Sequence, residues 1–450
     1  MNTLAHLDGA ALHLAWGLPF AGILLSIALL PLAAPRLWHH HFDKIAVGWA
    51  LAFLVPAAIV HGPAVAGTEF AHVMLAEFLP FLILIGALFI VTGGIRVTGN
   101  LVGTPETNLA LLACGTVLAS VMGTTGAAML LIAPLIRANA WRTHVTHIFV
   151  FHIFLVANIG GALTPIGDPP LFLGYLKGVD FFWTLRHLAL PTAAMALPLL
   201  GLFYLLDRRA FARETATPPQ MEARDERLGI EGGINLLFLA GIVGGVLLSG
   251  AWRPGVAWTV FGTELHLQDL ARGGILIACA GLSLACTRKA TRVANGFTWG
   301  PIREVGLLFF AIFVTIVPVV AIMRAGEGGA ASGLVGLVNQ DGRPIDALYF
   351  WIAGALSSVL DNAPTYLVFF NMAGGDAERL MHDLTRTLVA ISAGAVFMGA
   401  NTYIGNAPNF MVKAIAEAAG IRMPSFFGYV GWALVVLIPL FVVQTLIFFR

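Results

Sequence analysis

Charged residues are scarce in this sequence of 450 residues, where Lys, Arg, Asp and Glu together make up only 11%. Globular domains in water carry about a quarter charged residues. The formal net charge of +1 also leaves no basic excess of the kind that binds nucleic acid. A soluble enzyme and a nucleic-acid-binding protein are therefore both excluded.

Cysteine is equally rare, with three residues, Cys114, Cys279 and Cys286, all in apolar stretches. An odd number without ligand spacing predicts buried thiols and neither a disulfide framework nor a metal site. No segment pairs a nucleophile with a base or offers a phosphate-binding loop, so we expect no enzyme and no cofactor.

Long apolar runs dominate instead, since 58% of the residues are hydrophobic. Runs of about 20 such residues are long enough to cross a bilayer. In the first half we predict segments near 14–33, 43–62, 77–95 and 187–206, a paired segment at 106–136 and a broken span at 144–176. In the second half we predict segments near 233–250, 270–286, 303–323 and 427–449, a paired segment at 345–373 and a broken span at 384–416.

One long polar stretch, residues 207–231, divides the chain nearly in half and contains Pro218 and Pro219. The predicted organisation is a first unit at 1–206, a linker, and a second unit at 232–450. The predicted fold class is an all-α polytopic membrane protein with two repeats, each of five transmembrane helices with a re-entrant hairpin and a discontinuous helix.

A single offset of 238 residues aligns the two halves. It places Ser120 on Ser358, Thr124 on Asn362, Thr164 on Thr402 and Asp168 on Asn406, along with several glycines and prolines. Two separate polar motifs that align under one offset indicate an internal repeat.

The distribution of Lys and Arg predicts a cytoplasmic linker and outside N- and C-termini. Five crossings per half then make the repeats inverted, as in many secondary transporters. The first hairpin enters from the cytoplasm and the second from outside. We expect a multi-pass protein of a bacterial inner membrane.

Four polar interruptions break otherwise apolar segments, and we expect them to meet near mid-membrane, because a broken backbone survives in lipid only when it lines a cavity or is buried in protein. Their side chains are hydroxyls, amides and carboxylates, which are ligands preferred by hard cations. The candidate ion- or substrate-binding residues are Thr124, Thr125, Asn158, Thr164, Asp168, Asp361, Asn362, Thr365, Asn401, Thr402 and Asn406. The predicted backbone breaks lie at Gly123, Gly161, Gly167, Pro364 and Gly405.

Asp168 and Asp361 are the two carboxylates in this set. A carboxylate in a site of low dielectric constant favours a proton, and a bound cation displaces that proton, so one group can exchange H⁺ for Na⁺. We therefore predict Na⁺ at Asp168, Asp361 and their neighbours. The alternative is that each Asp merely caps a half-helix, since Asp is a common residue at helix starts.

Other titratable residues have plainer interpretations. Glu77 and Glu304 are expected to open corresponding spans as structural charges. His144, His147 and His152 share one span, and we expect them to serve packing or interfaces, with a proton relay as the alternative.

The motifs Asn158-Ile-Gly-Gly-Ala-Leu-Thr-Pro-Ile-Gly-Asp168-Pro-Pro and Leu360-Asp-Asn-Ala-Pro-Thr365 resemble the ion transporter superfamily. That superfamily includes NhaD-type sodium/proton antiporters, arsenite permeases, and citrate and citrate transporter-like permeases. The resemblance implies hairpin tips at Gly123-Thr124-Thr125 and at Asp361-Asn362, discontinuous helices that hold substrate and sodium, and a homodimer. In this sequence the two hairpin tips read Gly-Thr-Thr and Asp-Asn-Ala, whereas sodium/carboxylate transporters carry Ser-Asn-Thr there.

Two functions follow. The first is a Na⁺/H⁺ antiporter working by alternating access, because an added acid at a tip repels a dicarboxylate and attracts a cation. The alternative is a Na⁺- or H⁺-coupled symporter of citrate-like carboxylates, which half-helix N-termini and hydroxyls could bind. Broken helices in inverted repeats favour either carrier over a channel.

Overall fold

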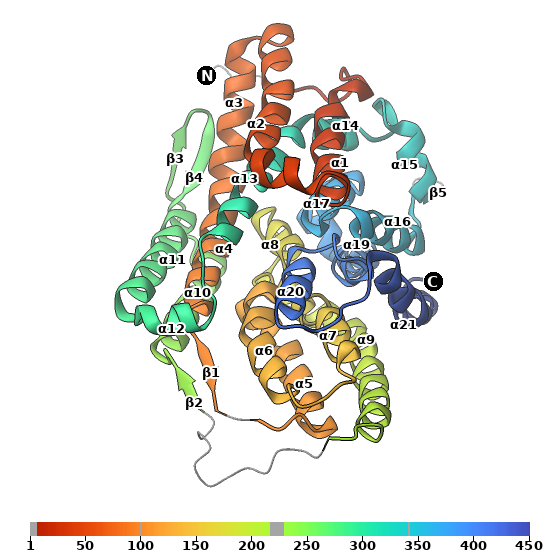
Figure 1. Cartoon of the computed structure of the whole chain (residues 1–450). Helices are drawn as coiled ribbons and strands as arrows, with labels where there is room; N and C mark the ends of the chain where they lie inside the picture. The colour runs from red at the N-terminus through yellow and green to blue at the C-terminus, as the bar shows by residue number, and fades with distance from the viewer. Residues whose placement is uncertain (1–6, 100, 217–228, 341–342) are drawn as a thin grey trace.

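The computed structural model describes residues 7–99, 101–216, 229–340 and 343–450. Within these ranges the chain is largely helical, and its short strands form three two-stranded sheets. Nine helices in the same ranges are long and apolar enough to cross a membrane, or ten if a bent pair counts as one span. The predicted all-α polytopic class is confirmed (Figure 1).

The first half follows the predicted order of segments. Its helical elements are η1 (Leu14–Gly17), α1 (Leu18–Ala33), α2 (Pro35–Val60), α3 (Pro63–His72), the π-helical segment η2 (Val73–Phe78), α4 (Leu79–Thr92), α5 (Pro105–Met122), α6 (Thr124–Ala138), α7 (Thr146–Leu155), η3 (Ile159–Leu163), α8 (Pro169–Leu176) and α9 (Phe181–Phe211). The helix pair α5–α6 occupies the first predicted hairpin, and α7–η3–α8 occupies the first predicted broken span.

The second half has the same succession. Its helical elements are α10 (Ile234–Ala251), α11 (Leu267–Cys286), α12 (Lys289–Ala294), α13 (Gly300–Thr315), α14 (Val317–Arg324), η4 (Gly326–Gly328), α15 (Ser332–Val338), α16 (Asp346–Val359), α17 (Asn362–Met372), α18 (Ala377–His382), α19 (Thr385–Met398), η5 (Gly399–Asn401), α20 (Ala407–Ala418) and α21 (Phe426–Phe448). The pair α16–α17 and the series α19–η5–α20 match the second predicted hairpin and broken span.

The strands only connect helices. They are β1 (Arg96–Thr98), β2 (Gly229–Glu231), β3 (Ala257–Val260), β4 (Thr263–His266), β5 (Asn339–Gln340) and β6 (Arg343–Pro344). All three sheets are antiparallel, and β1 pairs with β2 so that Arg96 lies opposite Glu231. This pairing joins the segment before the first hairpin to the start of the second half.

Local chemistry explains both hairpin breaks. Thr104 caps α5 by accepting a hydrogen bond from the Thr107 backbone N–H, and the helix ends at Gly123, whose φ of 81° suits glycine. The second pair breaks at Leu360, which is extended, and Asp361 then caps α17 through the Ala363 N–H. Pro364 therefore lies in the first turn of α17 and not at the break itself.

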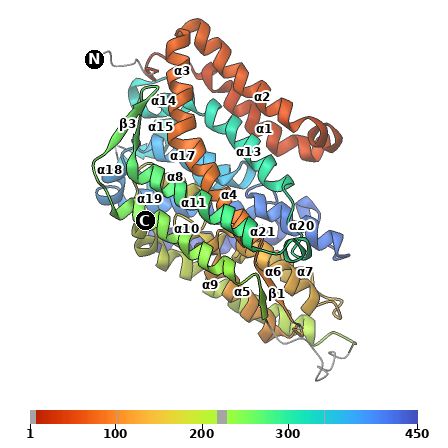
Figure 2. The same ribbon diagram turned by 90° about the vertical axis from the view of Figure 1, so that its left-hand side faces the viewer.

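Two predicted boundaries are wrong. The third span begins at Pro63 and not near residue 77, because α3, η2 and α4 form one continuous helical rod through Thr92 (Figure 2). Glu77 consequently lies inside the span and does not open it. The linker also begins later than predicted, because α9 continues through Asp207 to Phe211. Within the linker, residues 217–228 lie outside the described residues.

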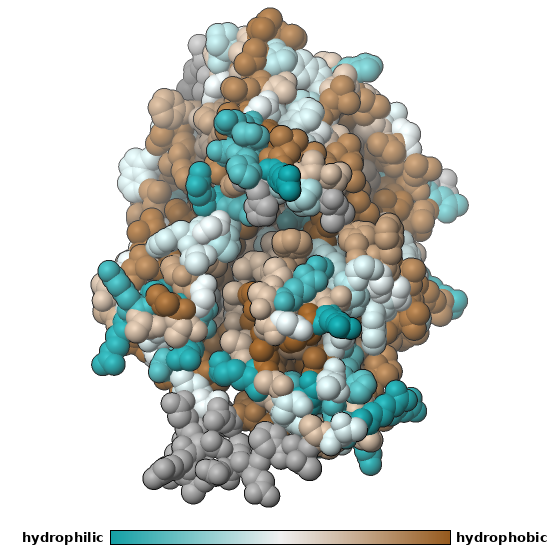
Figure 3. Space-filling view, viewed as in Figure 1, coloured by the Kyte–Doolittle hydropathy of each residue, from teal (hydrophilic) through white to brown (hydrophobic). Residues whose placement is uncertain are grey.

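The first helices of the two broken spans, α7 and α19, form the buried interior of the molecule. Every residue from His147 to Leu155 in α7 and from Thr387 to Met398 in α19 is buried. A helix that is buried on all sides is typical of a protein core or bundle interior. Exposed leucines and valines of α9 and α21 face outward instead, and apolar side chains cover much of the face in Figure 3.

In Figure 1 the pair α5–α6 lies in the lower part of the molecule, and the pair α16–α17 lies above it, near the middle of the view. The inverted arrangement across a membrane stays a prediction.

Candidate ion-binding site

Asp168 lies where the two hairpins and both broken spans meet. Its carboxylate accepts hydrogen bonds from Thr124 Oγ1 at 2.9 Å, Asn362 Nδ2 at 2.5 Å and Asn406 Nδ2 at 3.2 Å. Asp168, Thr124, Asn362 and Asn406 are each at most 3% exposed. Residues predicted to meet from three separate motifs therefore converge on one buried carboxylate.

In the structure Asp168 does not act as a helix cap, which was the alternative interpretation of its role. Asp168 occupies the position before α8, but its side chain makes no capping hydrogen bond to the helix. The carboxylate points instead at the hairpin tips, where it contacts Thr124 and Asn362. All three of its side-chain donors are neutral groups.

Asp361 has the opposite arrangement. Its carboxylate accepts a hydrogen bond from the Ala363 N–H at 3.1 Å and thereby caps α17. Asp361 is half-buried and lines the same cavity as Asp168. The Thr365 hydroxyl donates to the Asp361 carbonyl at 3.1 Å, which fixes the same turn. Asp361 is thus a capping residue whose carboxyl group also lies on the cavity wall.

Three asparagines form a layer behind Asp168. Asn406 Nδ2 lies 3.3 Å from Asn158 Oδ1, and Asn158 Nδ2 donates to Asn409 Oδ1 at 2.7 Å. Asn409 in turn donates to the carbonyls of Gly399 and Thr402. This layer joins the broken span of one half to that of the other. Asn409 lies in the predicted broken span at 384–416 but was not predicted as a binding residue.

Equivalent threonines make equivalent contacts in the two halves. Thr164 Oγ1 donates to the Ser120 carbonyl at 2.5 Å, and Thr402 Oγ1 donates to the Ser358 carbonyl at 2.6 Å. Each threonine also accepts a backbone N–H two residues later. These contacts repeat at the offset of 238 residues found in the sequence, which supports the predicted repeat. Both threonines hydrogen-bond to broken backbone, and Asp168 takes its side-chain hydrogen bonds from other residues.

Glycines allow the broken segments to lie close together. A Cβ on Gly167 would lie 2.2 Å from the Gly161 carbonyl oxygen, and one on Gly405 would lie 2.5 Å from the Gly399 oxygen. The Gly167 carbonyl also accepts the Thr124 backbone N–H at 2.8 Å. Three of the predicted breaks, Gly161, Gly167 and Gly405, are therefore positions of close backbone approach.

The remaining candidates lie at the edge of this arrangement. Thr125 is half-buried and lines the cavity, while Asn401 Nδ2 donates to Ser358 Oγ at 2.9 Å. Ser120 donates to the Gly160 carbonyl at 2.5 Å and accepts the Leu163 N–H. The importance of Ser120 and Ser358 could be found from the offset, which aligns them, although neither was predicted to bind substrate.

A cavity opens beside Asp168, between the hairpin tip at Gly123–Gly126 and the two spans that contain α4 and α13. Most of its described lining is apolar, and the acidic residues among that lining are Asp168 and Asp361. Thr124, Thr125 and Asn406 add polar atoms. A positively charged side chain is absent from this described lining, so the wall is complementary to a cation.

Asn362 carries a buried polar atom that has no partner among the described residues, its amide oxygen Oδ1. A buried acceptor without a partner costs about 1–3 kcal/mol, so such an atom requires an explanation. Rotation of the amide by 180° would direct this oxygen toward Asp168, where a shared proton or a bound cation would relieve the repulsion between two oxygens. The pair can therefore serve either ion.

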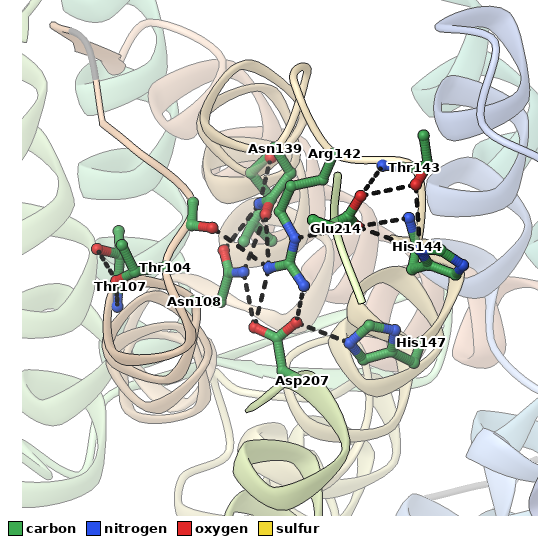
Figure 4. A network of polar contacts seen from close by, with 12 residues as sticks. Thr104, Thr107, Asn108, Asn139, Arg142, Thr143, His144, His147, Asp207 and Glu214 are labelled. Atoms are coloured by element: carbon green, nitrogen blue, oxygen red, sulfur yellow. Dashed lines mark hydrogen bonds and ion pairs between the residues drawn. The ribbon is translucent and has the colours of Figure 1, made fainter. Parts of the chain in front are cut away.

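A second polar cluster lies at the far end of α9 and is drawn in Figure 4. Asp207 accepts hydrogen bonds from Arg142 Nη2 at 2.5 Å, His147 Nε2 at 2.8 Å and Asn108 Nδ2 at 2.9 Å. Arg142 and Asp207 are both fully buried. The predicted structural role of His147 agrees with this ion pair, which joins α5, α7 and α9.

Glu214 extends that cluster beyond the end of α9. Its carboxylate accepts hydrogen bonds from Thr143 Oγ1 at 2.6 Å and from the backbone N–H groups of Thr143 and His144. Burial raises the pKa of Glu214, but these hydrogen bonds outweigh burial and lower its pKa to about 2. Glu214 thus remains ionised and fixes the turn that leads into α7.

Among the described residues no group of three or more His, Cys, Asp or Glu side chains could hold a metal ion. A monovalent cation at Asp168 would therefore take most of its oxygen ligands from Thr and Asn side chains and from carbonyls. Such neutral ligands suit weak, reversible binding.

Comparisons with known proteins place the chain among transporters. Residues 9–449 match the sequence profile of a family described as putative citrate transport. An uncharacterized transporter of Mycobacterium bovis is 28% identical over 331 residues, which cover 71% of each chain. A 46 kDa membrane protein of Mycobacterium leprae is 25% identical over 323 residues, again 71% of each chain.

Proposed function

The chain belongs to the family described as putative citrate transport and is a multi-pass membrane transporter, and we propose that it exchanges Na⁺ for H⁺. Asp168 is the group that holds either ion in turn. A bacterial inner membrane, outside termini and a homodimer belong to the same proposal.

One observation carries it: Asp168 is a buried carboxylate whose three side-chain partners are neutral. Burial of an uncompensated charge costs several kcal/mol. Asp168 therefore needs either a proton or a cation, and exchange of one for the other is antiport.

The geometry supports how the exchange would proceed. Thr124 and Asn362 come from the tips of the two hairpins, and Asn406 comes from the second broken span. A cation that replaces the proton would pull the Thr124 hydroxyl oxygen and the Asn362 amide oxygen toward itself. Both tips therefore respond to which ion is bound, which links occupancy to conformation.

The second candidate is a cation-coupled symporter of citrate-like carboxylates. The family description favours it, and so does the cavity lining, which includes the first turn of α6 at Thr124–Gly126 and the start of α20 at Ala407. Helix N-termini attract anions. In this alternative Asp168 would hold the coupling cation, which would also offset the repulsion between Asp361 and a carboxylate.

Purified protein in liposomes that contain a pH-sensitive dye distinguishes these candidates. Under the proposal, a Na⁺ gradient drives proton movement in the absence of any carboxylate. Labelled citrate added in parallel does not accumulate. If Na⁺ alone moves no protons and citrate accumulates under a Na⁺ gradient, the antiporter is wrong and the symporter is supported.

A further inference from the structure

A second chamber lies at the other end of the two spans that frame the first cavity. The first cavity is lined by Phe81–Phe89 of α4 and Pro301–Phe309 of α13. The chamber is lined by Glu69, His72 and Glu77 of α3 and η2, and by residues from Ile316 to Ala325 around α14. The same two spans therefore pass from one hollow to the other.

The chamber has more ionisable residues in its lining than the first cavity. Its described lining includes Asp8, Glu69, His72, Glu77, Lys177 and Arg324. Glu77 and Lys177 form an ion pair, with side chains only 11% and 18% exposed. Ionisable residues inside a membrane-spanning segment are costly and mark ion pathways by default.

Two short helices run from Asp168 to this chamber. Helix α8 starts after Asp168 and is capped at its other end by Lys177, which pairs with Glu77. Its eight residues make it about 12 Å long. Helix α17 packs beside α8, starts at Asn362, and carries Asn371 near its end, where Arg324 Nε donates to Asn371 Oδ1 at 2.6 Å. Each helix is thus tied to a framing span at the chamber.

Four phenylalanines pack against one another on the two framing spans. The ring centroids of Phe81 and Phe309 lie 4.6 Å apart, those of Phe81 and Phe313 lie 5.5 Å apart, and those of Phe78 and Phe313 lie 6.1 Å apart. Along each span the sequence passes directly from chamber lining, at Glu77 or Ile316, to this aromatic cluster. Phe81 and Phe309 also line the cavity beside Asp168, so along both spans the cluster lies between the two hollows.

Both framing spans are irregular at the level of the chamber. One contains the π-helical segment Val73–Phe78, and the other bends by 42° between Thr315 and Val317. π-Helical turns occur often at functional sites, and the bend directly precedes Pro318 in the first turn of α14, as sharp kinks commonly do. The irregular backbone of both spans therefore lies at the level of the chamber.

We propose that this chamber is a second aqueous route to Asp168, reached from the opposite side of the membrane from the first cavity. It admits a small hydrated cation. In this conformation the four phenylalanines and the Glu77–Lys177 pair close it. The inference rests on the proposed transport function, but it concerns access and not the identity of the ion.

Side-specific labelling tests the route without any transport assay. In a variant that lacks Cys114, Cys279 and Cys286, one new cysteine replaces Val320 in the chamber and, as the matched control, another replaces Val305 in the first cavity. A membrane-impermeant methanethiosulfonate carrying a positive charge is added to vesicles of either orientation.

The two cysteines should react from opposite sides of the membrane. Phe81→Ala combined with Phe313→Ala should make the cysteine at 320 reactive from the first-cavity side as well. The labelling rate from that side should be about tenfold higher than in the protein that keeps both phenylalanines. Reaction of both cysteines from the same side, or no reaction at 320 from either side, would overturn the proposal. Opposite-side labelling in a protein that moves no Na⁺ would instead leave the route intact and refute the antiporter.

Charge exchange tests the ion pair. Glu77→Lys and Lys177→Glu should each slow transport by about tenfold, and the double exchange should restore a substantial part of it, because the attraction is rebuilt. The same exchange at the exposed pair Arg96–Glu231 is the control and should change neither transport nor labelling. If the double exchange is no better than the single changes, the pair does not act as the closing contact.

Discussion

Asp168 and Asp207 are two buried aspartates with opposite surroundings. Asp207 is held by the guanidinium of Arg142 and by His147, so its charge is balanced within the protein. Asp168 receives only neutral donors from Thr124, Asn362 and Asn406. A buried carboxylate whose charge is balanced by neighbouring cationic side chains, such as Asp207, has a structural role. A buried carboxylate with only neutral hydrogen-bond donors, such as Asp168, needs a bound proton or cation and can therefore act as a binding site.

The largest expected effect is at Asp168. Asp168→Asn removes the group that exchanges ions while keeping its shape, and the amide can still accept hydrogen bonds from Thr124. Na⁺-driven proton movement should fall to the background of protein-free liposomes, while the folded yield and the unfolding temperature stay close to those of wild type. Retained exchange would remove Asp168 from the mechanism.

The reverse pattern is expected at Asp207. Asp207→Asn removes the nearer of the two carboxylates that face the buried Arg142, while Glu214 Oε1 remains 3.7 Å from Arg142 Nε. Loss of one member of a buried pair costs up to about 3–5 kcal/mol. The unfolding temperature in detergent should drop by about 5 °C or more. Transport per correctly folded molecule should change little. Severe loss of exchange in well-folded protein would contradict the division between the two aspartates.

Thr124→Val sharpens the comparison by removing one neutral donor from Asp168. A hydrogen bond to a charged group contributes about 1.5–3 kcal/mol, so Na⁺ affinity should weaken by about tenfold. Thr116→Val is a matched control on the same hairpin, because the Thr116 hydroxyl only bonds the Leu112 carbonyl of its own helix. Equal effects from the two variants would show that packing, and not the hydroxyl, matters at Thr124.

Asp361→Asn should have a smaller effect than Asp168→Asn. Asn also caps helices well, so α17 is preserved. Only a charge on the cavity wall is lost, and the KM for Na⁺ should rise by about threefold with kcat unchanged. Transport assays over a range of Na⁺ concentrations give both values. Complete loss of exchange would instead make Asp361 the exchanging group.

The smallest effect concerns pH and Glu214. Its pKa lies below the ordinary value of 4.5, at about 2, so the stability that its ionised form contributes is present above pH 4.5 and disappears as the pH falls toward 2. Wild type should therefore unfold at a higher temperature than Glu214→Gln at pH 7. The gap should narrow in scans between pH 4.5 and pH 3. A gap independent of pH would mean that the carboxylate charge is irrelevant.

The breaks in the helices could be predicted because their causes are local. Gly123, the Asn158–Asp168 motif and Asp361 interrupt apolar segments, and a common offset relates both halves. The partners of Asp168 could not be assigned in this way, because Asn362 is 194 residues away and only packing of α8 against α17 brings them together.

The sequence also could not reveal which aspartate is central. Asp361 and Asp168 both precede a helix, and only the orientation of each carboxylate distinguishes a cap from a binding group. The start of α3 was missed because Glu69 and His72 make the segment after Pro63 look too polar to span. Those residues are buried or half-buried beside the chamber, where a polar lining is tolerated.

The most direct test of the central claim is Na⁺ binding to the purified protein, measured at several pH values in wild type and in Asp168→Asn. If Asp168 holds either ion, the apparent Kd for Na⁺ rises as the pH falls, by up to about tenfold per pH unit, because each Na⁺ must displace a proton. The variant should then show no such binding. A Kd that is independent of pH, or equal Na⁺ binding by the variant, would contradict the account.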